Sequence, residues 1–230
     1  FSSGFKPTAT TTYLADIIPA KKRGQAMGIL GMSGSLGMGI GPFFGSWIAQ
    51  DFSVNIMFYA SSIVALFSIT VLMGMKETLV TKRKFTFSDL LIKPYDLFDF
   101  NVLAPVIVMF LSVFSFAIIL NVIPDFTDFL EIKNRGYFNL ILIITSIVVR
   151  FFGGSLSDKF GRVQMLRIGI SILFFGMIYL SFVTTKTEFI IAAILIGIST
   201  GINSPTIFAW NTDLANKDAM GRSMSSLFIG

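Results

Sequence analysis

The chain has 230 residues, of which 53% are hydrophobic and 13% charged, and its formal net charge is +5. Soluble domains usually carry about 25% charged residues, so a water-soluble core could not hide this much apolar surface, whereas a bilayer can. Cys and His are both absent, which excludes disulfides, thiol nucleophiles, imidazole bases and the usual zinc or haem ligands. We therefore expect no cofactor and no metal. The basic residues lie in short segments between apolar runs, so membrane topology explains the charge better than a nucleic-acid partner does.

Long apolar segments follow one another along the chain, and a helix that spans a bilayer needs roughly 20 such residues. A partial helix runs from the first residue to about residue 17, and another begins near residue 221. Six complete spans are expected between them, at residues 24–49, 56–75, 102–123, 137–152, 165–183 and 189–210. The predicted fold class is all-α, a polytopic membrane helix bundle.

The partial first helix carries a lysine near the middle of the membrane. Lys6 lies ten residues before Asp16, which corresponds to about 15 Å along a helix. A charge at that depth is costly and usually faces a cavity, so Lys6 is a candidate substrate or proton site. The alternative is a lysine whose long side chain reaches the membrane surface.

The first complete span carries a stripe of small residues. Gly37, Gly41 and Gly45 recur every four residues, and Pro42 removes one backbone donor and bends the helix. Such stripes let helices approach closely in lipid. The stripe predicts either a surface on which two helix bundles move against each other, or plain helix packing.

The longest polar stretch, residues 76–100, is basic and predicts a cytoplasmic linker between two helix bundles, residues 1–75 and 101–230. An internal similarity supports two related halves, because a shift of 197 residues aligns Asp16 with Asp213 and Gly24 with Gly221. Transporters built from parallel repeats show this kind of similarity.

Several polar residues interrupt the later spans. Arg150 either reaches the cytoplasmic surface with its side chain or lines the central pathway. Asn203 and Asn211 lie in the last complete span and either bind a substrate in a cavity or hydrogen-bond a neighbouring helix. Pro205 is expected to break that span.

A short charged segment, residues 153–164, lies between the apolar runs 140–149 and 168–183. We expect a tight turn between two membrane helices, with Asp158 near the positive amino end of a neighbouring helix. The segment resembles the loop motif of the major facilitator superfamily of secondary transporters, G-x-L-x-D-x-x-G-R-x-x-x-L. All six defined positions match, namely Gly154, Leu156, Asp158, Gly161, Arg162 and Leu166.

Two further segments resemble subgroups of this family. Residues 37–46 resemble the G-x-x-x-G-P-x-x-G-G motif of drug–proton antiporters, except that Ser46 replaces the last glycine. Residues 4–7 resemble the Lys-Pro step of proton-coupled peptide transporters. The resemblance implies a fragment that covers roughly helices 4 to 11 of twelve, and a loop motif that controls the cytoplasmic gate.

The basic residues predict the orientation in the membrane. Fourteen of the 18 Lys and Arg residues lie in alternate segments on one side, and three lie on the other. The positive-inside rule places the first side in the cytoplasm. We therefore expect a multi-pass protein of the cell membrane with cytoplasmic loops at residues 18–23, 76–100, 153–164 and 212–222.

These observations predict a secondary transporter and not an enzyme. It would move a small solute through the bilayer by alternating access, and the Gly-Pro helix favours proton-coupled efflux, an antiport. Proton-coupled uptake of an anionic solute or peptide is the alternative, favoured by Lys6. A transporter-like membrane receptor or an inactive fragment is the alternative of another class. No P-loop is present, and no paired carboxylates lie inside the spans.

Overall fold

The computed structural model describes residues 23–74 and 99–215, together with isolated positions near the two ends (10, 13, 17, 18, 223, 226 and 227). For residues 23–29, 152–156 and 158 it describes the backbone alone. The predictions for Lys6, Asp16 and the linker up to residue 98 lie outside the described residues.

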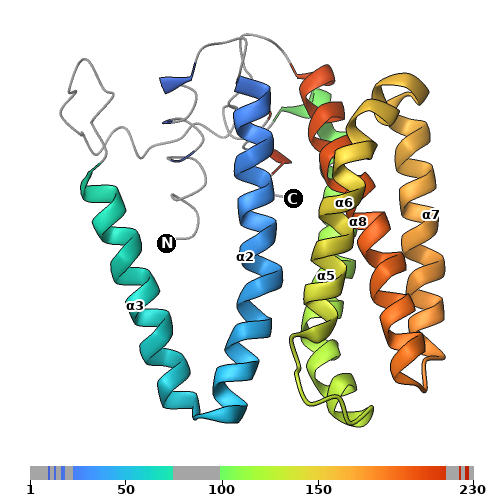
Figure 1. Ribbon diagram of the computed structural model, residues 1–230. Coiled ribbons are helices and arrows are strands. Elements are labelled where there is room, and N and C mark those ends of the chain that lie inside the picture. Colours follow the sequence, from blue (N-terminus) through green and yellow to red (C-terminus); the bar gives the residue numbers. More distant parts are fainter. Residues whose placement is uncertain are drawn as a thin grey trace.

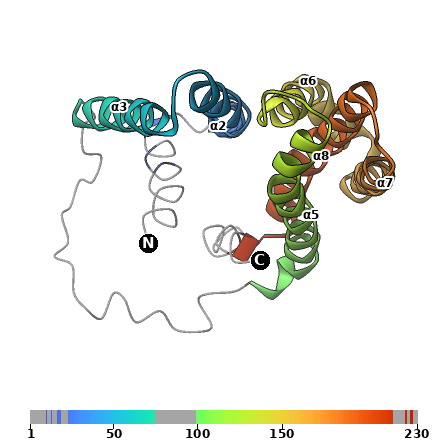
Figure 2. The same ribbon diagram turned by 90° about the horizontal axis from the view of Figure 1, so that it is seen from below.

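The described part is a bundle of long helices that run roughly parallel to one axis (Figure 1). They are α2 (Arg23–Asp51), α3 (Val54–Met73), α5 (Leu103–Phe129), α6 (Tyr137–Phe160), α7 (Arg162–Ser181) and α8 (Lys186–Leu214), with a short 3-10 helix, η3 (Phe100–Val102), before α5. Figure 2 shows α2 and α3 as one pair, and α5 to α8 as a second group beside it. The structure thus confirms an all-α bundle.

Local sequence signals fix two of the helix starts. Ser53 accepts a hydrogen bond from the backbone of Ile56 and begins α3. Thr185 and Glu188 form a reciprocal capping box at the start of α8. Such side chains satisfy backbone N–H groups that have no partner within the helix.

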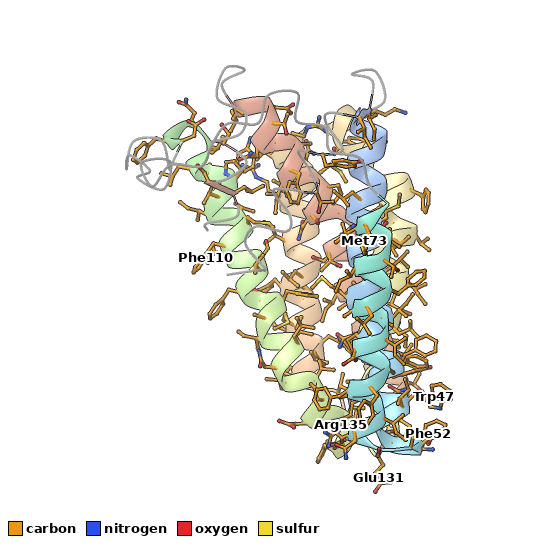
Figure 3. The ribbon with its side chains drawn as sticks, turned by 90° about the vertical axis from the view of Figure 1, so that its left-hand side faces the viewer. Trp47, Phe52, Met73, Phe110, Glu131 and Arg135 are labelled. Carbon is orange, nitrogen blue, oxygen red and sulfur yellow. The ribbon has the colours of Figure 1, made fainter. Side chains whose placement is uncertain are left out.

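Different connections between helices lie at the two ends of the bundle. We call the end with the α6–α7 junction the Gly161 end, and the end with the α2–α3 turn and the α5–α6 loop the Arg135 end. In Figure 3, Arg135 and Glu131 of that loop lie at the same end as Trp47 and Phe52. The loop and the turn therefore lie together, although some 80 residues separate them in the chain.

The outer surface is strongly apolar. The α3 helix buries none of its residues in the described structure, and Met73 and Phe110 are 81% and 52% exposed (Figure 3). Exposed apolar surface on this scale would be unstable in water and is what a bilayer covers. By length and composition, four of the described helices (α3, η3–α5, α7 and α8) could each cross a membrane, and Tyr137–Phe151 is a shorter apolar stretch.

The structure corrects two expectations about where helices end. The α6 helix continues to Phe160, eight residues beyond the expected span, so most of segment 153–164 is helix and not a loop. The α5 helix likewise continues to Phe129. Hydropathy marks the edge of the bilayer, whereas a helix can continue into water wherever its backbone remains paired.

The expected break at Pro205 was wrong. The α8 helix runs without interruption from Lys186 to Leu214, with Pro205 inside it. Proline removes one donor from the backbone ladder, but a long helix that is packed on its neighbours tolerates this loss. Pro42 and Pro124 also lie inside α2 and α5.

Candidate functional site: a cavity between α2 and the second helix group

A cavity of about 240 Å³ lies where α2 meets α5, α6, α7 and α8. Most of its lining is apolar, and Arg150 is the one charged residue of that lining in the described structure. Lining residues from the five helices include Ser35, Met38, Met109, Ser112, Phe116, Ser146, Arg150, Leu173, Thr200 and Asn203. The cavity therefore joins the two parts of the molecule that the sequence places before and after the linker.

Arg150 occupies one wall of this cavity. Its Nη1 donates a hydrogen bond of 2.8 Å to Ser35 Oγ on α2, and Ser35 in turn donates to the carbonyl of Gly31 at 3.0 Å. The Arg150 Nε is buried without a hydrogen-bond partner among the described residues. Arg150 therefore contributes to the lining of this cavity in the described structure.

Ser146 lies one helical turn before Arg150, and its hydroxyl is also buried without a hydrogen-bond partner in the described structure. Residues four apart on a helix lie on the same face. The two residues thus present unsatisfied polar groups side by side at this cavity.

Asn203 belongs to a polar contact between α7 and α8. Its Nδ2 donates to Ser199 Oγ at 3.0 Å, and Ser199 donates to the carbonyl of Gly169 at 2.8 Å. A Cβ added at Gly169 would lie 2.0 Å from Asn203 Oδ1, so the amide occupies the space that this glycine leaves. Asn203 contributes to the cavity lining and also joins two helices.

Asn211 lies at the Gly161 end and not in the cavity. Its Nδ2 donates to the carbonyl of Ser223 at 3.3 Å. Ser223 also donates to the carboxylate of Asp99, whose backbone N–H donates to Ser226 at 2.8 Å. Asp99 is 3% exposed, and sequence reasoning missed it because it was assigned to the polar linker. The available signal was an Asp directly before an apolar run, because Asp is a residue type that caps helices. In the structure, Asp99 does accept a hydrogen bond from the backbone N–H of Asn101.

The loop motif forms a junction of three helices at the Gly161 end. Gly161 separates α6 from α7 with φ of 86°, a backbone conformation that favours glycine. Arg162 donates to Asp213 of α8 at 2.9 Å and to Ser157 of α6 at 2.6 Å, and Leu166 is buried. Gly154, Leu156 and Asp158 lie on the helical backbone of α6, and their side chains are outside the description.

At the Arg135 end, the α5–α6 loop contacts the end of α2. Asn134 donates to the carbonyl of Phe43 at 3.1 Å, the backbone N–H of Arg135 donates to Ser46 Oγ at 3.0 Å, and Lys133 pairs with Asp51 at 2.7 Å. The Arg135 side chain also pairs with Asp128, and that hydrogen-bonded carboxylate raises the pKa of Arg135. These contacts hold the two helix groups together at this end.

Among the described residues, no other helix packs its backbone closely on the α2 glycine stripe (Gly37, Gly41 and Gly45). A Cβ added at Gly37 or Gly41 would meet none of the described residues within 4 Å. The close contact between α2 and α6 is instead at Gly39, where an added Cβ would lie 2.6 Å from Ile143 Cβ. Pro42 and Gly45 line a second, more open hollow of about 570 Å³ at the Arg135 end.

Comparison of the sequence with known protein families identifies the family to which the chain belongs. The family model of the Major Facilitator Superfamily matches residues 1–230. This chain belongs to the major facilitator superfamily. Membership confirms the resemblance seen in the loop motif and makes the chain part of a multi-pass membrane transporter family.

Individual relatives agree with this assignment. An uncharacterized MFS-type transporter of Methanocaldococcus jannaschii is 28% identical, over 99% of this chain and 62% of its own length. A multi-drug resistance efflux pump PmrA homolog of Lactococcus lactis is 24% identical, over 96% of this chain and 56% of its own length. Synaptic vesicle glycoprotein 2A of Rattus norvegicus is 29% identical over 95 residues, 41% of this chain and 13% of that protein. The chain thus spans less than two thirds of the length of these relatives.

Proposed function

We propose that the protein is a secondary transporter that moves a small solute across the cell membrane by alternating access, and that its direction is proton-coupled efflux. The observation that carries the proposal is the central cavity between α2 and the second helix group. A cavity at the junction of two bundles is where a solute can be reached from either side when the bundles rock. Family membership favours transport over an enzymatic function.

In this proposal the chain forms two bundles, residues 1–75 and 101–230, joined by the cytoplasmic linker 76–100. In this proposal the Gly161 end is cytoplasmic. The hydrogen bonds and the ion pair between α2 and the α5–α6 loop close the outer side. The junction of Arg162 and Asp213, together with Asp158, controls the cytoplasmic side.

Efflux is favoured by the Gly-Pro segment of α2 and by the similarity to an efflux pump homolog. Uptake, the alternative that Lys6 favours, depends on a residue outside the described part of the chain. Direction and coupling therefore need a flux measurement.

The test is flux by the full-length protein in proteoliposomes, with a panel of fluorescent dyes and with or without a pH gradient. Efflux coupled to protons predicts dye movement against its own gradient when the opposite compartment is acidic. Equal flux with and without the pH gradient would remove proton coupling. No flux for any dye would remove the transport proposal.

A variant pair tests the gate. Asp158→Asn should impair flux and leave membrane insertion intact, because the motif carboxylate is expected at the positive end of a neighbouring helix. Asp125→Asn is the matched control, since Asp125 is an exposed carboxylate near the Arg135 end of α5. Unchanged uptake or efflux kinetics in Asp158→Asn would rule out the gate.

A further inference from the structure

The cavity contains a cation with no counter-charge in the described structure. Among the described residues, no Asp or Glu lines it, and the hydrogen bond described for the Arg150 guanidinium goes to a neutral hydroxyl, that of Ser35. Removing a charge from water costs several kcal/mol unless a partner compensates it. Charged residues inside a membrane bundle therefore pair with each other or face a pathway that carries a ligand.

The hydrogen bonding of Arg150 leaves donors of its guanidinium unused, and these suit one anionic group. Arginine presents five N–H donors in a planar fork that matches a carboxylate. Ser35 occupies Nη1, so the side of the fork that carries Nε has no partner among the described residues. The Ser146 hydroxyl, one turn away on the same helix face, is a second group without a partner. A single carboxylate near Arg150 would satisfy both residues.

The rest of the cavity is suited to an apolar body. From Arg150 the lining follows α6 to Leu142, eight residues or about 12 Å along the helix. Met38, Met109 and Phe116 form part of this lining, and Met side chains adapt to differently shaped apolar ligands. The volume of about 240 Å³ lies just below the roughly 300–1,000 Å³ of pockets for drug-sized ligands, so the ligand is compact.

We propose that this cavity binds an amphipathic organic monoanion, a carboxylate on a compact apolar body, whose carboxylate is held by Arg150 and Ser146. The inference deepens the proposed function and rests on it, because it takes this cavity as the transport site. A neutral analogue would leave the guanidinium unpaired, and a cationic analogue would be repelled by it.

The test is equilibrium binding to the purified full-length protein, with three probes that share one apolar body. They are 4-phenylbutyrate, 4-phenylbutyramide and 4-phenylbutylamine, measured by calorimetry in detergent at neutral pH. We expect the anion to bind at least about tenfold more tightly than the other two, since a charge-assisted hydrogen bond contributes more than a neutral one. Equal binding of all three, preference for the amine, or no binding of any probe would overturn the inference.

Variants assign the preference to Arg150. Arg150→Gln should abolish the preference for the anion, and Arg150→Lys should retain part of it. Arg167→Gln is the matched control, because Arg167 is an exposed arginine of α7 outside the cavity lining, and it should bind as the parent does. If Arg150→Gln does not fold, Ser146→Ala carries the test with an expected loss of about threefold in anion affinity. A full anion preference in every variant that folds would overturn the inference.

Binding and flux separate the two proposals. Anion-selective binding without flux of any solute would remove the transport proposal and leave the binding site. Dye flux without anion-selective binding would remove the site and leave the transport proposal.

Discussion

Two sets of glycines with the same spacing behave differently in this molecule. In α8, a Cβ added at Gly197 would lie 2.6 Å from the carbonyl oxygen of Leu142, and one at Gly201 would lie 2.7 Å from that of Ser146. In α2, Gly37 and Gly41 have the same four-residue spacing, yet no residue that the structure describes lies within 4 Å of the added atom. The α8 pair lets two helix backbones touch, whereas the α2 pair has no such neighbour in the described part of the chain.

The difference teaches that spacing alone does not identify a helix contact. Small residues four apart always form a smooth stripe, but a stripe stabilises the fold only when another backbone packs on it. The α8 glycines hold the second helix group together. The α2 glycines have no such partner in the described part of the chain, and their role in the movement of the two bundles stays a prediction.

Substitution of the α8 glycines should have the largest effect and is therefore the strongest test of the difference between the two pairs. Gly197→Ala and Gly201→Ala should each cost about 1–3 kcal/mol, because the methyl group must displace the backbone of α6. The measurement is thermal unfolding of the purified protein in detergent, with Gly37→Ala as the control. Melting temperatures equal to the parent's would show that α6 and α8 do not touch at these glycines.

Substitution of Gly136 tests whether a glycine also permits a close backbone contact at the Arg135 end. A Cβ there would lie 2.3 Å from the backbone nitrogen of Phe43, so Gly136→Ala should move the α5–α6 loop away from α2. The chain lacks Cys, so an introduced Asp51→Cys and Lys133→Cys pair can report this distance by cross-linking. We expect cross-linking to fall several-fold when Gly136→Ala is added. Undiminished cross-linking would contradict the close approach.

The α2 pair should show a smaller effect of opposite sign. Alanine favours a helix over glycine by about 0.5–1 kcal/mol, so Gly37→Ala and Gly41→Ala should leave thermal stability unchanged or slightly raised. Gly41→Leu should slow solute flux without lowering stability if α2 uses this stripe during movement. A large loss of stability in the alanine variants would show that a close neighbour does cover the stripe.

The smallest expected effect is at the ion pair between Lys133 and Asp51. The Lys133 side chain is 79% exposed, and exposed ion pairs contribute little to stability and weaken with salt. Lys133→Ala should therefore shift the melting temperature by less than Gly136→Ala does, and the shift should shrink at high salt. A salt-independent loss comparable to that of the glycine variant would show that the pair, and not backbone packing, joins the loop to α2.

The sequence by itself determined the family and the class of fold. The apolar runs predicted six long helices, and the motif that ends at Leu166 predicted the major facilitator superfamily. Both signals are local, because hydropathy reports contact with lipid residue by residue and the motif is contiguous. The same signals placed the end of α6 too early, since the charged residues before Gly161 leave the membrane without leaving the helix.

Tertiary structure alone decided which polar and small residues meet. Arg150 and Ser35 are 115 residues apart in the chain, and no local pattern could have paired them or shown that the guanidinium has no counter-charge among the described residues. The two glycine stripes are indistinguishable by spacing and differ only in what packs on them. Close approach and charge compensation are properties of two distant segments at once, and they are fixed only when the helices are assembled.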